Sequence, residues 1–154
     1  MTPAVAIAEK AGIAFRIHQY EHDPEHASYG EEAAQKLAVD PARVFKTLVV
    51  SLDGRLVVAV VPVAGRLDMK AVAKALKGKR AEMAPAAEVA RATGYVLGGV
   101  SPLGQKRRLP TLIDVSAEGF ETIYVSAGRR GLEIELRAED LRRLLNGGFA
   151  PLAR

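Results

Sequence analysis

The sequence predicts a mixed α+β fold in which helices pack on a mainly antiparallel sheet. Segments with the period-two alternation of strands interleave irregularly with segments whose apolar residues recur at helical spacing. Asp53-Gly54 joins two β-branched runs, 44–52 and 55–63, and Asp-Gly between such runs is the strongest short-range signal for a β-hairpin. A hairpin is antiparallel, so the pattern argues against a doubly wound parallel sheet.

The N-terminal half contains four predicted elements: helix 3–11, strand 13–20, helix 31–38 and the 44–63 hairpin. Thr2 is a favourable N-cap, Pro3 suits the first helical position, and Gly12 ends the first helix. The run 56–61 is almost entirely apolar, which predicts a strand buried on both faces.

The C-terminal half contains helices 68–76, 85–93 and 139–145, an extended segment 95–97, and strands 111–115, 122–126 and 132–136. Asp68 is placed to cap the first of these helices, and Gly94 to end the second. Gly147-Gly148 is expected to lie in a loose tail. No repeat or linker divides the chain, so residues 1–154 are predicted to form one domain.

The composition narrows the class of protein. The chain is 49% hydrophobic and 26% charged, an ordinary balance for a soluble domain, and its net charge of +4 is compatible with a nucleic-acid partner. The absence of cysteine excludes disulfides, thiolate metal sites and a cysteine nucleophile. No signal peptide and no apolar run of membrane-spanning length is present, so we expect a cytoplasmic protein with no membrane partner.

The segment 98–111 is the most unusual stretch, because it combines three glycines, two prolines and the cations Lys106, Arg107 and Arg108. Glycines allow a ligand to approach the main chain, and convergent backbone N–H groups form an anion or oxyanion site. The alternative is a surface loop that ends in a solvated basic tail.

Lys46 stands near the start of a strand that is otherwise apolar. Its side chain either extends to the surface or faces a pocket, where the ammonium group would bind a phosphate or carbonyl oxygen. The basic turn at Arg129-Arg130 could follow a polyanion together with residues 106–108. For both basic segments the alternative is a solvated run of charge.

Three histidines, His18, His22 and His26, recur at intervals of four, as metal ligands on a helix would. His18 belongs to a predicted strand and Pro24 interrupts the remainder, which favours ordinary hydrogen-bonded or exposed histidines. We therefore expect no metal and no cofactor.

Taken together, the motifs resemble the YbaK family of trans-acting aminoacyl-tRNA deacylases, a relative of the editing domain of bacterial prolyl-tRNA synthetases. The resemblance runs almost end to end through Thr2-Pro3-Ala4-Val5, His18-Gln19-Tyr20-Glu21-His22-Asp23, Val44-Phe45-Lys46-Thr47-Leu48, Val61-Pro62-Val63-Ala64-Gly65, Thr93-Gly94-Tyr95, residues 98–106, Leu109-Pro110-Thr111 and Ile123-Tyr124-Val125-Ser126-Ala127-Gly128. The match is closest to the Cys-tRNA(Pro) deacylase branch. It implies a partly barrel-like sheet with surrounding helices.

The resemblance implies hydrolysis of the ester that joins cysteine to proline tRNA, with the substrate's own thiol attacking its carbonyl carbon. The implied partners are the acceptor end of aminoacyl-tRNA and prolyl-tRNA synthetase. Three alternatives remain: a broader or alanine-type deacylase, a catalytically silent tRNA-binding module, and, ranked last, a metal-dependent hydrolase.

The family's functional residues map onto two groups of positions. The catalytic group, in which the lysine positions the ester and the loop N–H groups hold the carbonyl oxygen, is Lys46, Gly98, Gly99, Val100 and Ser101. The substrate-binding group is Tyr20, Tyr29, Thr47, Pro102, Ser126 and Glu133. The two basic runs, by their charge and not by the resemblance, form the predicted tRNA-contact group: Lys106, Arg107, Arg108, Arg129 and Arg130. Tyr29 stands where Phe is common and Glu133 where Asp is common, and both differences bear on the size of the pocket.

Overall fold

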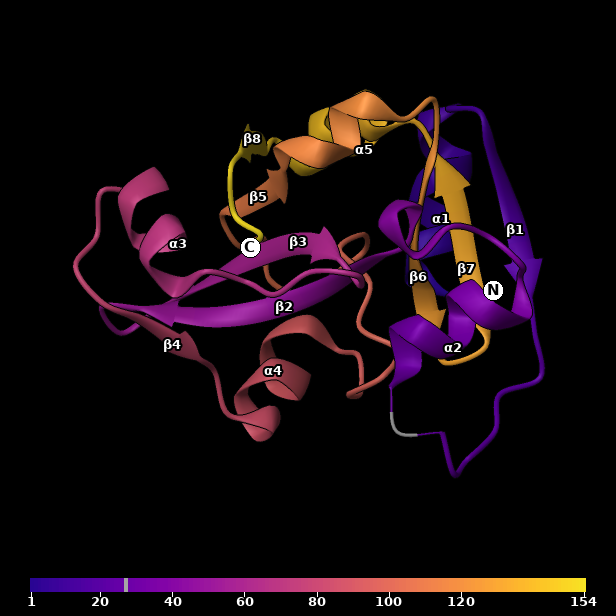
Figure 1. Ribbon diagram of the computed structural model, residues 1–154, viewed down its shortest axis with the longest axis horizontal. Helices are drawn as coiled ribbons and strands as arrows, with labels where there is room; N and C mark the ends of the chain where they lie inside the picture. Colours follow the sequence, from indigo (N-terminus) through magenta and orange to yellow (C-terminus); the bar gives the residue numbers. More distant parts are fainter. Residues whose placement is uncertain (27) are drawn as a thin grey trace.

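The computed structural model describes residues 1–26 and 28–154, and it contains two sheets (Figure 1). The small sheet is antiparallel and has the order β1 (Phe15–Gln19), β7 (Leu132–Leu136), β6 (Ile123–Arg129). The large sheet has the order β4 (Ala81–Met83), β2 (Phe45–Leu52), β3 (Arg55–Pro62), β5 (Thr111–Asp114), β8 (Gly148–Ala150). A parallel bridge between Val44 and Tyr124 joins the two sheets. Both sheets are open, so the barrel-like character does not extend to a closed barrel.

The large sheet is mixed, as the sequence predicts. β2 pairs in antiparallel fashion with β3 and β4, whereas β5 pairs in parallel with β3 and β8. The β2–β3 hairpin turns at Asp53 and Gly54, whose φ angles of 51° and 84° are both positive. Positive φ at both central residues defines the type I′ turn that Asp-Gly favours, and the predicted hairpin is therefore confirmed.

Five α-helices surround the sheets: α1 (Pro3–Ala11), α2 (Tyr29–Lys36), α3 (Met69–Ala75), α4 (Ala86–Thr93) and α5 (Ala138–Leu145). Short 3₁₀ helices are η1 (Pro41–Arg43) and η2 (Val115–Gly119). α3 and α4 cover opposite faces of the large sheet, because β3 sends alternate side chains to each of them. Val57, Ala59 and Val61 pack with α3, whereas Val58 and Val60 pack with α4, which confirms the strand buried on both faces.

The predicted helices agree with the structure within one residue at each end, except helix 31–38, which is observed two residues earlier as α2. The Thr2 hydroxyl accepts the Val5 N–H at the start of α1, and the Asp68 carboxylate accepts two backbone N–H groups at the start of α3. Gly12 and Gly94 end α1 and α4 in the left-handed conformation.

Other segments also differ from the prediction. Residues 95–97 form no strand; a turn begins at Leu97, and the Gly99 N–H donates to the Val96 carbonyl at 3.0 Å. Gly148 does not lie in a loose tail but begins β8, and the Asp114 carboxylate accepts the N–H groups of Leu152 and Ala153 just beyond it. These long-range bonds fix the C-terminal segment.

Among the described residues, no helix combines the length and the apolar character that crossing a membrane requires.

Candidate active site

A pocket of about 340 Å³ opens where the two sheets meet the start of α2 and the loop after α4. β4 pairs only with Val50–Leu52, so the edge of β2 from Phe45 to Leu48 is left open to this pocket. Eight of the predicted site residues line it: Tyr20, Tyr29, Lys46, Thr47, Gly98, Val100, Ser126 and Glu133. Residues separated by more than a hundred positions thus meet in one concavity.

Lys46 is one of the residues that line the pocket. Its Nζ atom donates to the Gly65 carbonyl at 3.2 Å, and the side chain is half-buried. Burial lowers the pKa of this ammonium group, with Glu31 opposing the shift and Arg66 adding to it. A cation with one protein acceptor retains donors for a substrate oxygen.

The pocket wall also holds polar groups that have no protein partner. The Thr47 hydroxyl is buried and makes no hydrogen bond with any described residue. The N–H groups of Gly98 and Val100 likewise have no acceptor in the described part of the chain. Because buried polar groups are normally satisfied, such groups around a cavity indicate where a ligand would bind.

Glu133 is the acidic residue of the pocket. Its side chain is buried, and burial raises its pKa to about 8. It lies opposite Ser126 across the β6–β7 pair, and the Ser126 hydroxyl accepts the Gly128 N–H. Burial, with a contribution from Glu133, raises the pKa of Tyr20 to about 12. The uncharged forms of both groups therefore dominate at neutral pH, and each can donate a hydrogen bond.

Tyr29 is held at the rim of the pocket by Arg130 and Gly98. The Arg130 guanidinium lies 4.0 Å from the centre of the Tyr29 ring, a cation–π contact. Gly98 has a φ of 93°, and a Cβ there would lie 3.0 Å from the ring. Only glycine gives the ring this space at a positive φ.

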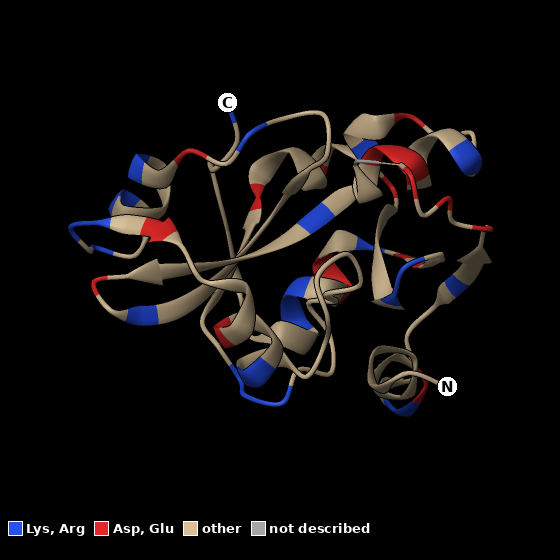
Figure 2. Ribbon diagram, turned by 90° about the horizontal axis from the view of Figure 1, so that it is seen from below, with Lys and Arg blue, Asp and Glu red and all other residues tan. Residues whose placement is uncertain are grey.

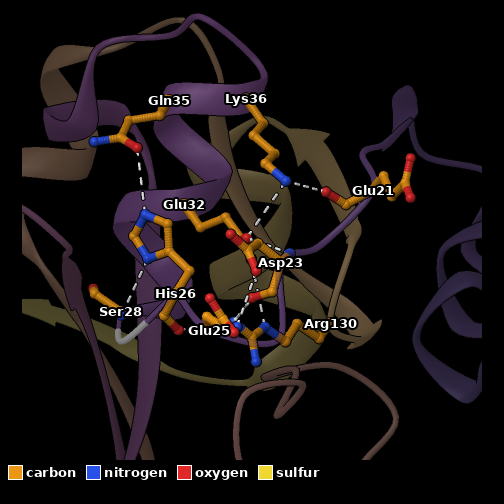
Figure 3. A network of polar contacts seen from close by, with 9 residues as sticks. All are labelled: Glu21, Asp23, Glu25, His26, Ser28, Glu32, Gln35, Lys36 and Arg130. Carbon is orange, nitrogen blue, oxygen red and sulfur yellow. Dashed lines mark hydrogen bonds and ion pairs between the residues drawn. The ribbon is translucent and has the colours of Figure 1, made fainter.

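Arg130 is itself part of a network that fixes the segment before α2 (Figure 3). It donates to the carbonyls of Asp23 and His26, and its Nε lies 3.4 Å from a carboxylate oxygen of Glu32, which is fully buried. Burial would raise the pKa of Glu32, but the Asp23 N–H, Arg130 and Lys36 lower it overall. Arg130 thus supports the pocket wall.

A model of the aminoacyl-tRNA editing domain matches residues 23–144, most of the chain. The chain belongs to the aminoacyl-tRNA editing domain family. A relative from Enterococcus faecalis, named "Putative Cys-tRNA(Pro)/Cys-tRNA(Cys) deacylase EbsC", is 38% identical over 152 residues, covering 98% of this chain and 92% of the relative. The "Uncharacterized protein YwhH" of Bacillus subtilis is 31% identical over 112 residues, covering 72% of this chain and 71% of that protein.

Solved structures share the whole fold of this editing domain. A structure described as "a putative trans-editing enzyme for prolyl tRNA synthetase" superposes with a TM-score of 0.86 at 21% identity, covering 100% of this chain and 99% of the other. The "hypothetical protein APE2540" gives a TM-score of 0.87 at 22% identity, covering 99% and 100%. At these identities the likeness establishes the fold, and the predicted mixed α+β architecture is confirmed.

Three residues predicted from the loop do not line the pocket of this editing domain. Gly99 packs against the β6–β7 turn, where a Cβ would lie 2.7 Å from the Arg129 Cα. Ser101 is fully buried and its hydroxyl accepts the Leu103 N–H at 3.2 Å, so it is occupied within the loop. Pro102 is buried as well.

The predicted tRNA-contact residues separate into two places. Lys106, Arg107 and Arg108 are exposed at the end of the loop, and Arg129 is exposed beside the pocket. Arg130 is mostly enclosed by the network around Glu32.

The pocket also contains residues that the sequence did not indicate: Ser28, Gly30, Phe45, Leu48 and Leu97. The glycine at position 30 could have indicated a close contact. A Cβ there would collide with the Val63 side chain, so this position at the start of α2 requires glycine. Leu97 remains 68% exposed although it borders the pocket.

The three histidines do not converge. His18 bonds to Glu135 at 2.9 Å, and His26 contacts Gln35 at 3.3 Å. Within residues 1–26 and 28–154, no group of three or more metal-ligating side chains is placed to hold an ion.

Proposed function

We propose that this editing domain is a trans-acting deacylase that removes cysteine from mischarged proline tRNA. The arrangement that supports it is the pocket in which Lys46, the Thr47 hydroxyl and the N–H groups of Gly98 and Val100 surround one small cavity. A volume of about 340 Å³ is near the lower end of the roughly 300–1,000 Å³ typical of small-molecule sites, which suits an aminoacyl ester. The Enterococcus relative, whose name specifies cysteinyl-tRNA, supports the same substrate class.

The pocket is equipped to orient an ester and to stabilise its carbonyl oxygen. Backbone N–H groups at Gly98 and Val100 have the donors that an oxyanion needs, and Lys46 can hold the 3′ nucleotide. No serine or threonine hydroxyl of the pocket has a hydrogen-bonded base among the described residues: Ser126 accepts from Gly128, and His18 is engaged by Glu135. We therefore propose that the substrate itself supplies the nucleophile.

In the proposed reaction the cysteine sulfur attacks its own carbonyl carbon. A sulfur–carbon bond forms as the carbon–oxygen ester bond breaks, giving a cyclic thioester and the free 3′ end of the tRNA. The proton lost by the thiol is balanced by the proton gained by the departing ribose oxygen. Size discrimination between amino acids of similar volume is weak, which is why a second, editing site is useful.

In this proposal a partner protein, and not the editing domain itself, selects the tRNA. A small domain with a net charge of +4 has little surface for reading a tRNA body, so it binds chiefly the acceptor end. Association with prolyl-tRNA synthetase in the cytoplasm would supply the choice of tRNA. The Enterococcus relative is named for both proline and cysteine tRNAs, which agrees with weak discrimination by the domain alone. We also propose that residues 1–154 form a single editing domain.

The test is deacylation of cysteinyl-tRNA(Pro) by the wild type and by Lys46→Ala, with alanyl- and seryl-tRNA(Pro) as parallel substrates. We expect rapid loss of cysteine, slow loss of alanine and serine, and a collapse of activity in the variant. Equal rates on all three esters would refute thiol assistance, and equal rates of wild type and variant would refute the role of Lys46. Inactivity on every ester, with tRNA still bound, would favour the silent binding module.

A further inference from the structure

A second concavity lies at the far end of the large sheet and is larger than the pocket, with a volume of about 790 Å³. Its walls are the β2–β3 turn, the residues after α3, one turn of α4 and the end of the 98–111 loop. We call it the hairpin groove. No step of the proposed reaction uses it.

Four cations from three separate segments line the hairpin groove: Arg55, Lys77, Arg107 and Arg108. All four are exposed, and none forms an ion pair with a residue in the described ranges, although Arg108 donates to the Leu144 carbonyl outside the groove at 3.1 Å. Sequence reasoning singled out the two loop arginines, but only the fold brings Arg55 and Lys77 beside them.

Two carboxylates share the groove without cancelling its charge. Asp53 accepts the N–H groups of Lys79 and Arg80, just after α3, at 2.9 Å each; these bonds lower the pKa of Asp53, so its carboxylate keeps its negative charge and offsets one of the four cations. Glu88 at the start of α4 is the other. Figure 2 shows Lys and Arg in several parts of the molecule, and among the residues that line the hairpin groove the cations outnumber the acids two to one.

The hairpin groove is connected to the pocket by two elements. Strand β2 runs from Lys46 in the pocket to Leu52 in the groove, six residues or about 20 Å at a strand rise of about 3.3 Å. The 98–111 loop begins at the pocket with Gly98 and reaches the groove at Arg107–Pro110. A tRNA whose 3′ aminoacyl end occupies the pocket extends beyond it, and the adjoining part of the acceptor stem can lie over the hairpin groove.

We propose that the hairpin groove binds the phosphate backbone of the tRNA acceptor stem while the aminoacyl end occupies the pocket. Arginine and lysine from several segments suit successive phosphates, and backbone contacts position a duplex without reading its sequence. This inference rests on the proposed function, since it takes aminoacyl-tRNA as the substrate. It makes the groove a positioning surface that increases affinity for intact tRNA.

The experiment compares the double variant Arg55→Gln/Lys77→Gln with a control, Lys10→Gln/Arg137→Gln. Both variants lose two exposed positive charges, but the control residues line neither concavity. Binding of uncharged tRNA(Pro) is measured as a function of salt. Deacylation is measured on cysteinyl-tRNA(Pro) and on the cysteinyl ester of adenosine monophosphate, which is too short to span about 20 Å.

For the groove variant we expect roughly tenfold weaker binding of tRNA at low salt, and a slope of log affinity against log salt reduced by about two. Its kcat/KM should fall on cysteinyl-tRNA but not on the short ester, and the control should resemble the wild type. Unchanged binding in the groove variant, or an equal loss in the control, would overturn the proposal. Failure of the wild type to hydrolyse either ester would refute the deacylase function, and the binding measurements would still decide the groove.

Discussion

Replacing Glu133 by glutamine tests whether the pocket keeps this carboxyl group uncharged. The side chain is 6% exposed, and burial raises its pKa from 4.5 to about 8. Between these two values the native protein retains a proton that the unfolded chain has released. The free energy of unfolding of the wild type therefore falls as pH rises through this window, by about 1.4 kcal/mol per pH unit for one proton.

The stabilising effect of the bound proton is complete below pH 4.5 and is lost once pH exceeds about 8. From pH 5 to pH 8 the loss amounts to at most about 4 kcal/mol. Glutamine has a similar shape and no proton to release, so Glu133→Gln lacks this loss. The variant should gain stability relative to the wild type as pH rises, and its advantage should level off once pH exceeds about 8.

Urea unfolding at several pH values between 5 and 9 measures the effect, with Glu118→Gln as a control because Glu118 is an exposed carboxylate on η2. Other ionisable groups are common to the wild type and the variant, so their contributions cancel in the difference. If the two stability profiles stay parallel from pH 5 to pH 8, Glu133 does not hold a proton in the native pocket and the reasoning fails.

Two further predictions concern the pocket wall. Gly99→Ala would place a Cβ 2.7 Å from the Cα of Arg129, so the loop or the facing turn must shift; we expect about 1–3 kcal/mol lower stability in urea unfolding and reduced deacylation. Arg130→Gln leaves the buried Glu32 carboxylate with Lys36 as its remaining cation, and we expect a loss of about 3 kcal/mol, which the double variant with Glu32→Gln should partly recover. A double variant as unstable as the single one would contradict this account.

The sequence predicts the parts of the fold whose signals are local. The Asp53-Gly54 turn needs positive φ at both positions, and few residue pairs other than Asp-Gly and Asn-Gly tolerate it. Thr2 and Asp68 cap their helices through bonds that span only two or three residues. Such interactions depend on neighbours in the chain, so a single sequence is sufficient to find them.

The two short edge strands could not be found in this way. β4 and β8 have three residues each and carry no alternation or β-branched run of their own. They become strands because β2 and β5 offer unpaired backbone groups to them. The pairing of β4 with β2 and of β8 with β5 depends on contacts between distant segments, which the local sequence does not contain. For this reason the sequence wrongly predicts a loose tail at Gly148.

The site was predictable in part for the same reason. The composition of the 98–111 loop and the position of Lys46 in an apolar strand mark both as unusual, and the resemblance to editing domains supplied Thr47 and Glu133 as site residues. Without that resemblance, Glu133 would pass for the exposed half of an ordinary alternating strand, Leu132–Leu136. It is nevertheless buried, and α2 packs on the small sheet through Ala33 and Ala34, which lie in one buried cluster with Tyr124 of β6; no local pattern encodes this packing.

The protonation state of Glu133 also bears on which esters the pocket can cleave. A charged carboxylate opposite Ser126 could act as a base for that hydroxyl, whereas a protonated one cannot. A cysteine thiol, with a pKa near 8.5, is partly ionised at neutral pH without help from the protein, and a serine or alanine ester has no equivalent group. A pocket that orients the ester while withholding a base therefore favours substrates that carry their own nucleophile. If the proposed reaction is correct, selectivity for cysteine follows from the chemistry of the substrate more than from the fit of its side chain, and enlarging the pocket should relax this selectivity far less than ionising Glu133.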